Sequence, residues 1–255
     1  MDVTNRFVLD FALRHGGRVL DYGCGAGEVV AAGRSRGLDI SGVDVFYGGS
    51  ETRRQAERAG LLGGAVREIR GGRIPFPEGS FDLVTNNQVM EHVEDLDAVL
   101  LEIRRVLRRG GTVLSIFPSA DVWREGHIGI PFSHRLPKGS RLRFYYTWAL
   151  RSLGLGTWKE QAPDARQWAI DKLAWIDAWT RYRTRREIFA AYGRYFSSEA
   201  CETAYIRFRL LDRPTPLRRF LARTAGWPVA GALERALFRK LAFLVIVSRK
   251  KEGGG

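Results

Sequence analysis

The chain contains very little cysteine and no long apolar run. Its 255 residues include two cysteines, Cys24 and Cys201, which cannot build a disulfide framework, so the count is typical of a protein from a reducing compartment. The longest apolar run, residues 241–247, is far shorter than the ~20 residues that a membrane-spanning helix needs. No basic segment followed by an apolar core opens the sequence, so we expect no secretory signal and a cytoplasmic location.

Repeats and low-complexity linkers are also absent. Hydrophobic residues make up 45% of the chain and charged residues 27%, which is ordinary globular composition. At this length a fold buries about 70–75% of the surface of the unfolded chain, so it needs no disulfide for stability. We therefore predict one domain over residues 1–255.

Charge and tryptophan are unevenly distributed around a net charge of +13. Residues 1–120 hold 15 Lys and Arg against 16 Asp and Glu, whereas residues 121–255 hold 26 against 12. All seven tryptophans also follow residue 120. This asymmetry predicts a nearly neutral core over residues 1–118 and a basic, aromatic addition that meets a partner or substrate.

Apolar runs and helical patterns alternate five times before Pro118, which predicts a parallel sheet with helices on both faces. The expected strands cover residues 18–22, 38–45, 65–69, 81–85 and 112–117, and the clearest helix covers 96–107. Later segments predict helices at 141–153 and 164–192, a strand at 204–211, a basic helical segment at 214–240 and a last strand at 241–248.

These elements together predict an α/β fold with a doubly wound, Rossmann-like, seven-stranded and mostly parallel sheet. Helical insertions follow the fifth strand and precede the last one. Within the single domain we expect a cofactor-binding core at 1–118 and a helical, acceptor-binding insertion at 119–195. Residues 196–255 are expected to complete the sheet and to carry the basic helical segment.

A glycine cluster forms the densest motif of the chain. Residues 19–28 combine a strand, the pattern D-x-G-x-G-x-G and a helix start. Glycine permits positive φ and lets a ligand approach bare backbone, and ligands bind at the first strand-to-helix turn of such sheets. Glu28 at the helix start would repel a pyrophosphate, so the motif favours a cationic or zwitterionic ligand. Asp44 ends the second strand, where a carboxylate can accept both hydroxyls of a ribose.

Five segments in order resemble the class I S-adenosylmethionine-dependent methyltransferases, nearest to the quinone-biosynthesis branch: residues 19–28, 42–44, 75–84, 91–93 and 106–112. The resemblance covers roughly 40% of the chain and implies S-adenosylmethionine as cofactor. It places the loop of Gly23, Cys24, Gly25 and Gly27 under the methionine part, Asp21 near its amino group, Asp44 on the ribose, and Asn86, Asn87 and Gln88 near the sulfonium.

One position departs from the pattern of that family. An acidic residue that holds the adenine amine often stands five positions before the Pro-Phe pair, but here Arg70 occupies that place. Glu68 lies two residues earlier, and the backbone of the flanking Ile69 is the expected substitute.

Three histidines are candidate catalytic residues. Methyl transfer is an in-line displacement from an activated donor, so alignment of the acceptor contributes most, and a base adds about 10²–10⁴ in rate for a hydroxyl acceptor. His92 follows the fourth strand, and His127 and His134 follow the fifth, where an acceptor would dock. Packing residues or an ordinary polar loop remain alternatives. Glu125, His127 and His134 lack the close spacing of metal ligands, so no metal is predicted.

The basic residues of 121–255 bear on the class of acceptor. A pI near 10.3 suggests nucleic acid, but residues 85–89 lack the Asn/Asp-Pro-Pro-aromatic motif of amino-directed nucleic-acid methyltransferases, and no Pro-Cys pair is present. Residues 213–240 mix basic and apolar side chains and either contact an anionic membrane or pack as a solvated helix. The sequence predicts methyl transfer to a small-molecule, sugar or lipid-linked acceptor, at oxygen. The alternatives are an RNA methyltransferase and a non-catalytic adenosylmethionine-binding partner protein.

Overall fold

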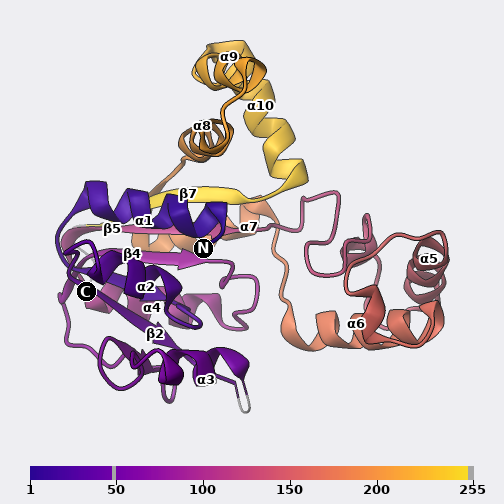
Figure 1. The fold of residues 1–255 in the computed structure, drawn as a ribbon, viewed down its shortest axis with the longest axis horizontal. Coiled ribbons are helices and arrows are strands. Elements are labelled where there is room, and N and C mark those ends of the chain that lie inside the picture. Colours follow the sequence, from indigo (N-terminus) through magenta and orange to yellow (C-terminus); the bar gives the residue numbers. More distant parts are fainter. Residues whose placement is uncertain (48–49, 252–255) are drawn as a thin grey trace.

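A seven-stranded sheet forms the centre of the molecule in the computed structural model, which describes residues 1–47 and 50–251 (Figure 1). The strand order is β3-β2-β1-β4-β5-β7-β6. Neighbouring strands from β3 to β5 pair in parallel, and β7 runs antiparallel to both β5 and β6. The strands are β1 (Val19–Tyr22), β2 (Ile40–Asp44), β3 (Val66–Glu68), β4 (Phe81–Asn87), β5 (Leu107–Phe117), β6 (Phe196–Ala200) and β7 (Leu244–Lys250). The predicted fold class is confirmed.

Helices cover both faces of this sheet, and each face has its own hydrophobic cluster. One cluster joins the sheet to α4 (Leu96–Val106) and α7 (Arg185–Tyr195), and the other joins it to α1 (Val3–His15) and α2 (Glu28–Arg34). α3 (Glu51–Arg58) follows β2. The helix predicted at 96–107 is confirmed, since its apolar positions three and four residues apart form one buried stripe.

The insertion after β5 forms a separate lobe beside the sheet (Figure 1). It contains α5 (Arg141–Ser152), α6 (Ala165–Trp179) and two short 3-10 helices, η1 (Ser133–Arg135) and η2 (Lys159–Gln161). The lobe has its own apolar cluster, formed by Ile128, Ile130, Trp168, Ala169 and Ile176. Trp168, one of the seven tryptophans after residue 120, is therefore a core residue of this lobe.

The single helix predicted over residues 164–192 is wrong. α6 ends at Trp179, residues 180–184 are not helical, and α7 begins after Thr184. Thr184 and Glu187 form a capping box, which starts a new helix at this point. The break matters for the site, because the Arg181 N–H donates to the Glu91 carbonyl (2.6 Å) and ties the insertion to the loop after β4.

The strand predicted over residues 204–211 is also wrong. This segment belongs to α8 (Glu202–Asp212), and the sixth strand is β6, which lies just before it. Tyr205 and Phe208, three residues apart, both pack on Phe7 of α1, with ring centroids 5.1 and 5.3 Å apart. The alternation of polar and apolar residues suggested a strand, whereas the contacts follow the helical spacing of three.

The basic helical segment is confirmed, with its break before Pro228. It forms α9 (Pro216–Thr224) and α10 (Pro228–Leu241), and each helix begins with proline in its first turn, where the missing N–H costs no hydrogen bond. α8, α9 and α10 group together next to α1 and β7, on the face of the sheet that α1 covers (Figure 1). Within the part of the chain that the structure describes, no helix is long and apolar enough to cross a membrane.

Candidate cofactor and acceptor site

A pocket opens at the carboxyl ends of β1, β2 and β4. Ligands of open α/β sheets bind outside these strand ends, where the order of the strands reverses. The lining contains one carboxylate and no Lys or Arg, which suits a cationic ligand better than a phosphate. The lining residues are Tyr22, Gly23, Asp44, Val45, Tyr47, Ile69, Gln88, Val89, His92 and Val93.

The glycine loop reaches this pocket at Gly23, whereas Gly25 and Gly27 are not among the residues that line it. Gly23, Gly25 and Gly27 all have positive φ, at 75°, 52° and 79°. A Cβ on Gly23 would lie 2.3 Å from the Val89 side chain, so only glycine fits between β1 and the loop after β4. The Cys24 side chain lies against Gly42 of β2, where an added Cβ would come within 2.6 Å of the Cys24 Sγ. Cys24 is not among the residues that line the pocket. Cys24 therefore fills a small space behind the loop.

Asp44 ties the glycine loop to the turn after β2. Its Oδ2 accepts a hydrogen bond from the Gly25 N–H (2.9 Å), and its Oδ1 accepts one from the Phe46 N–H (2.9 Å). A carboxylate has about four lone-pair positions, so two remain for hydroxyl groups of a ligand. Asp44 thus serves the pocket both as a ligand-facing acceptor and as the residue that holds the loop in place.

Asp21 lies buried under the loop. Its Oδ1 accepts a hydrogen bond from the Thr85 hydroxyl (2.8 Å). Burial raises the pKa of Asp21 to about 7; the Thr85 hydrogen bond acts in the opposite direction, and the nearby Asp44 carboxylate adds to the rise. At neutral pH the side chain is therefore close to half ionised, and a bound ammonium group would draw it into the ionised form.

The three residues predicted near the sulfonium, Asn86, Asn87 and Gln88, have different surroundings. Gln88 has a positive φ of 55° and lines the pocket. Asn86 is buried in the sheet, where its Nδ2 donates to the Ser115 hydroxyl (2.9 Å), and the Asn87 Nδ2 donates to Asn5 of α1 (2.8 Å). Neither asparagine is among the residues that line the pocket, so of these three residues only Gln88 lies at the pocket.

Ile69, whose backbone is the predicted contact for the adenine amine, lies at the pocket. Its amide N–H donates to the Asp44 carbonyl (2.8 Å), so that N–H is not free to contact a base. Arg70 turns outward and pairs with Glu68 (2.9 Å). Because the adenine amine is a donor, the predicted backbone contact needs the Ile69 carbonyl and not its N–H, and it stays a prediction.

The insertion reaches the pocket through α6. The Tyr47 ring, which lines the pocket, packs on Trp179 with ring centroids 4.9 Å apart. The His92 Nδ1–H donates to the Trp179 carbonyl (2.7 Å), which leaves its Nε2 without that proton. Sequence reasoning did not identify Trp179 or Tyr47 as site residues, because their meeting depends on how the insertion folds back on the core.

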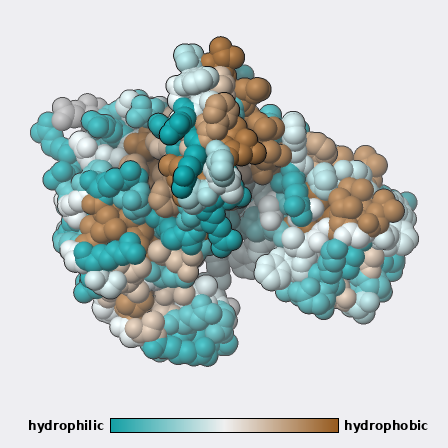
Figure 2. Space-filling view, turned by 45° about the horizontal axis from the view of Figure 1, so that its top comes forward, coloured by the Kyte–Doolittle hydropathy of each residue, from teal (hydrophilic) through white to brown (hydrophobic). Residues whose placement is uncertain are grey.

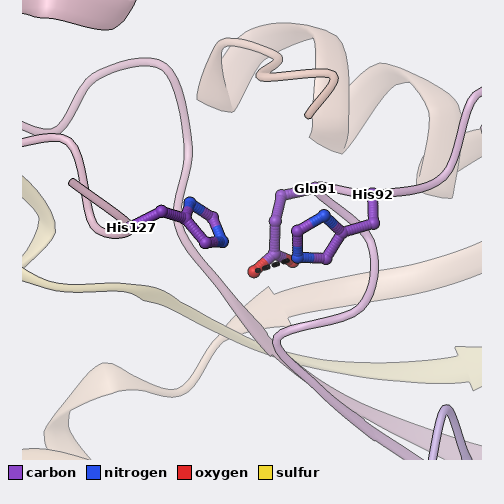
Figure 3. A group of neighbouring side chains, drawn as sticks. All are labelled: Glu91, His92 and His127. Carbon is purple, nitrogen blue, oxygen red and sulfur yellow. Dashed lines mark ion pairs between the residues drawn. The ribbon is translucent and has the colours of Figure 1, made fainter. Parts of the chain in front are cut away.

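Two of the three candidate histidines meet beside the pocket. The rings of His92 and His127 lie 5.1 Å apart (Figure 3). The His127 Nδ1–H donates to Glu125 (2.8 Å), and the Tyr182 hydroxyl also donates to that carboxylate. Burial lowers the pKa of His92. For His127 burial acts in the same direction, but the hydrogen bond and charge of Glu125 outweigh it and raise the pKa.

Glu91 completes this group, and its carboxylate points toward the two rings (Figure 3). It is 2% exposed, and neither of its carboxylate oxygens accepts a hydrogen bond from the residues that the structure describes. Burial raises its pKa to about 8. The nearest ion-pair partner is the His92 Nε2 at 4.0 Å. Glu91 was not among the predicted site residues, although it stands beside His92 in the same motif.

His134 lies on the other side of Tyr182. Its Nε2 contacts the Ala120 carbonyl (3.2 Å), and its ring lies 5.2 Å from the Tyr182 ring. It does not line the pocket. The structure therefore brings His92 and His127 together and leaves His134 outside the group.

The parallel sheet, the glycine loop and the acidic strand ends define a cofactor-binding α/β enzyme. Residues 20–115 match the family described as "Methyltransferase domain". An uncharacterized methyltransferase of Mycobacterium sp. (strain KMS) is 32% identical over 178 residues, which cover 67% of this chain and 68% of that protein. The chain belongs to this family, and its cofactor is S-adenosylmethionine.

Other comparisons agree on the fold. The malonyl-[acyl-carrier protein] O-methyltransferase of Serratia marcescens is 29% identical over 133 residues, and the match spans 49% of this chain but only 50% of that relative. The crystal structure of an S-adenosylmethionine-dependent methyltransferase from Mesorhizobium loti has a TM-score of 0.55 at 19% identity and covers 95% of this chain and 96% of that one.

The raised pKa of Asp21 predicts a pH-dependent cofactor affinity. We expect S-adenosylmethionine to bind about 20-fold more weakly near pH 5.5 than near pH 7.5, because its ammonium group favours ionised Asp21, whose pKa is about 7. Calorimetry across this range measures the effect. Asp21→Asn keeps an acceptor for Thr85 and should remove most of the dependence; an equally steep profile in that variant would refute the assignment.

Proposed function

We propose that this enzyme transfers the methyl group of S-adenosylmethionine to an oxygen of a small-molecule, sugar or lipid-linked acceptor. One observation carries the proposal: His92 lines the cofactor pocket and faces His127 of the insertion. The acceptor would dock between the pocket and the insertion lobe, with its reacting oxygen at the two histidines.

Each residue of the site then has a separate role in the proposed reaction. The cofactor supplies an activated methyl group when it is bound. Asp44 and the glycine loop hold it, and the contact between Tyr47 and Trp179 narrows the pocket beside it. Holding both reactants in line can contribute about 7–11 kcal/mol of the barrier reduction. His92 and His127 activate the acceptor oxygen.

The names of the relatives give mixed support for oxygen as the methylated atom. The Serratia protein and the ubiquinone biosynthesis protein of Pectobacterium carotovorum are both named O-methyltransferases. A sterol 24-C-methyltransferase of Gibberella zeae is also 34% identical, over 110 residues. Oxygen is favoured here because a hydroxyl acceptor needs the activation that two half-buried imidazoles can provide.

The proposal is tested by label transfer from S-adenosylmethionine that carries a labelled methyl group. Fractions of a cell extract, separated into aqueous and organic phases, are incubated with the wild-type protein or with Asp44→Ala. We expect labelled product only with the wild type, and its phase identifies a lipid-linked acceptor. Label that disappears on ribonuclease treatment would indicate RNA instead. Cofactor binding without label in any fraction would favour a non-catalytic binding protein.

We further propose that the enzyme works at the inner face of a membrane, with α9 and α10 on its surface. Residues 213–240 carry seven basic side chains and one acidic one. A hydrophobic area covers the same part of the molecule (Figure 2). Its exposed residues include Leu217, Phe220, Trp227, Val229, Leu233 and Leu237. Basic and apolar residues together suit an anionic bilayer. Both cysteines are free, which fits a reducing compartment.

Cosedimentation with vesicles tests this surface. We expect binding to anionic vesicles, weak binding to neutral ones, and a loss of about tenfold or more for Val229→Glu with Leu233→Glu, since each side chain would lose about 1.5–3 kcal/mol of apolar burial. Leu142→Glu on α5, where the residue is 65% exposed, is the matched control. Equal binding by the double variant, or no binding by the wild type, would exclude the membrane contact.

A further inference from the structure

We propose that Glu91, His92 and His127 bind a divalent metal ion of the zinc type beside the cofactor pocket. Each residue offers one ligand atom, and the three atoms all lie within 4.8 Å of one another. They come from two distant segments, the loop after β4 and the insertion, which meet only in the folded chain (Figure 3). Two imidazoles and one carboxylate are a ligand set of catalytic zinc sites.

The Nδ1–H groups of His92 and His127 already make the hydrogen bonds that metal-ligating histidines make. In metal sites the other ring N–H of a ligating histidine almost always donates to a carboxylate or a backbone carbonyl, which fixes the tautomer. Here the His92 Nδ1–H donates to the Trp179 carbonyl and the His127 Nδ1–H donates to Glu125. In the neutral rings both Nε2 atoms therefore carry a lone pair that is available for coordination.

Glu91 provides a second and independent observation. Its side chain is 1% exposed, and neither carboxylate oxygen has a hydrogen-bond partner among residues 1–47 and 50–251. A buried polar group without a partner costs free energy, and buried charges are normally paired or coordinate metals. Glu125 lies in the same region but accepts hydrogen bonds from His127, Tyr182 and the Ile128 N–H. Glu91 thus differs from its neighbour in lacking a hydrogen-bond donor among the described residues, and its nearest ion-pair partner is the His92 Nε2 at 4.0 Å.

The donor set indicates the kind of metal and its use. Imidazole ligands suit zinc and similar transition metals, whereas Mg²⁺ prefers oxygen ligands. Bonds of about 2.0–2.1 Å bring tetrahedral ligands to roughly 3.3 Å from one another, so these side chains must move inward by about 1 Å. Three protein ligands leave a position open, where an oxygen of the acceptor can bind. The inference deepens the proposed function: with a metal bound, the metal activates the acceptor oxygen and the two imidazoles hold the metal. Binding of the metal itself does not depend on that function.

Binding of Co²⁺, which reports its coordination by visible absorption, tests the site in the full-length protein after treatment with a chelator. We expect equimolar binding with micromolar or tighter affinity, displacement by Zn²⁺ and no competition from Mg²⁺. Glu91→Gln should weaken Co²⁺ binding by about 30-fold or more, because it removes the anionic ligand. His134→Gln, a histidine of the same insertion outside the group, should bind Co²⁺ as the wild type does.

Titration of S-adenosylmethionine on the same samples separates the two proposals, since it reports the folded cofactor pocket without the metal. The metal site is refuted if the wild type binds the cofactor but no Co²⁺, or if Glu91→Gln binds Co²⁺ as tightly as the wild type. It is also refuted if His134→Gln loses Co²⁺ while it keeps the cofactor. Loss of cofactor binding by the wild type would count against the proposed function alone.

Discussion

Asp44→Ala is expected to bind S-adenosylmethionine about 100-fold more weakly than the wild type. The substitution removes two hydrogen bonds that hold the Gly25 N–H and the Phe46 N–H, together with the acceptors for the ribose hydroxyls. Hydrogen bonds to a charged group are worth about 1.5–3 kcal/mol each, and a net loss of about 2.8 kcal/mol corresponds to 100-fold in affinity. Calorimetry measures the dissociation constant directly.

Asp39→Ala provides the control for this variant. Asp39 is an exposed aspartate just before β2, and its contact with Arg18 lies outside the pocket. It should bind the cofactor within about twofold of the wild type, since surface ion pairs contribute little. If Asp44→Ala has the circular dichroism of the wild type and binds within threefold of it, Asp44 does not hold the ribose.

His127→Gln should lower turnover by about 100-fold and leave the affinity for S-adenosylmethionine unchanged. His127 lies beyond His92 as seen from the cofactor pocket and does not line it, so its loss affects the acceptor oxygen and not the cofactor. Loss of acceptor activation typically costs 10²–10⁴ in rate. Single-turnover label transfer to the acceptor fraction, with calorimetry on the same protein, separates the two effects.

His15→Gln is the matched control, because His15 is an exposed histidine at the end of α1 with no role in the site. Its turnover should equal that of the wild type. Turnover by His127→Gln within a few fold of the wild type would show that the insertion does not activate the acceptor. A parallel loss of cofactor affinity would instead place His127 in the cofactor pocket.

The core of the fold was predictable because its signals are local. Most strands from β1 to β5 contain an apolar run next to a glycine, proline or helix, although β3 has only Val66 buried. The loop at Gly23–Gly27 carries its own conformational requirement. Asp44 was predictable for the same reason, since strand order alone brings it to the pocket. These elements can therefore be located from residues that are close together in the chain.

The remaining features depend on contacts between distant segments. α8 was mistaken for a strand because its polar and apolar residues alternate. The contact that supports the helix joins Tyr205 to Phe7, which lies about 200 positions away in the chain. Asn86 was expected at the ligand, but a hydrogen bond to Ser115 of the neighbouring strand holds it inside the sheet. Trp179 reaches the site because α6 ends there and the chain folds back before α7. The helical periodicity over 164–192 hid that break, although the capping box of Thr184 and Glu187 marks a new helix start.

The most direct test of the central claim is a calorimetric titration of the wild-type protein with S-adenosylmethionine, with NADH as the competing cofactor. The pocket, which Asp44 and Gly23 line without any Lys or Arg, predicts equimolar binding of S-adenosylmethionine at micromolar concentration and no heat with NADH, whose pyrophosphate it would repel. Binding of NADH by the folded protein in the absence of any binding of S-adenosylmethionine would contradict the assignment of this pocket.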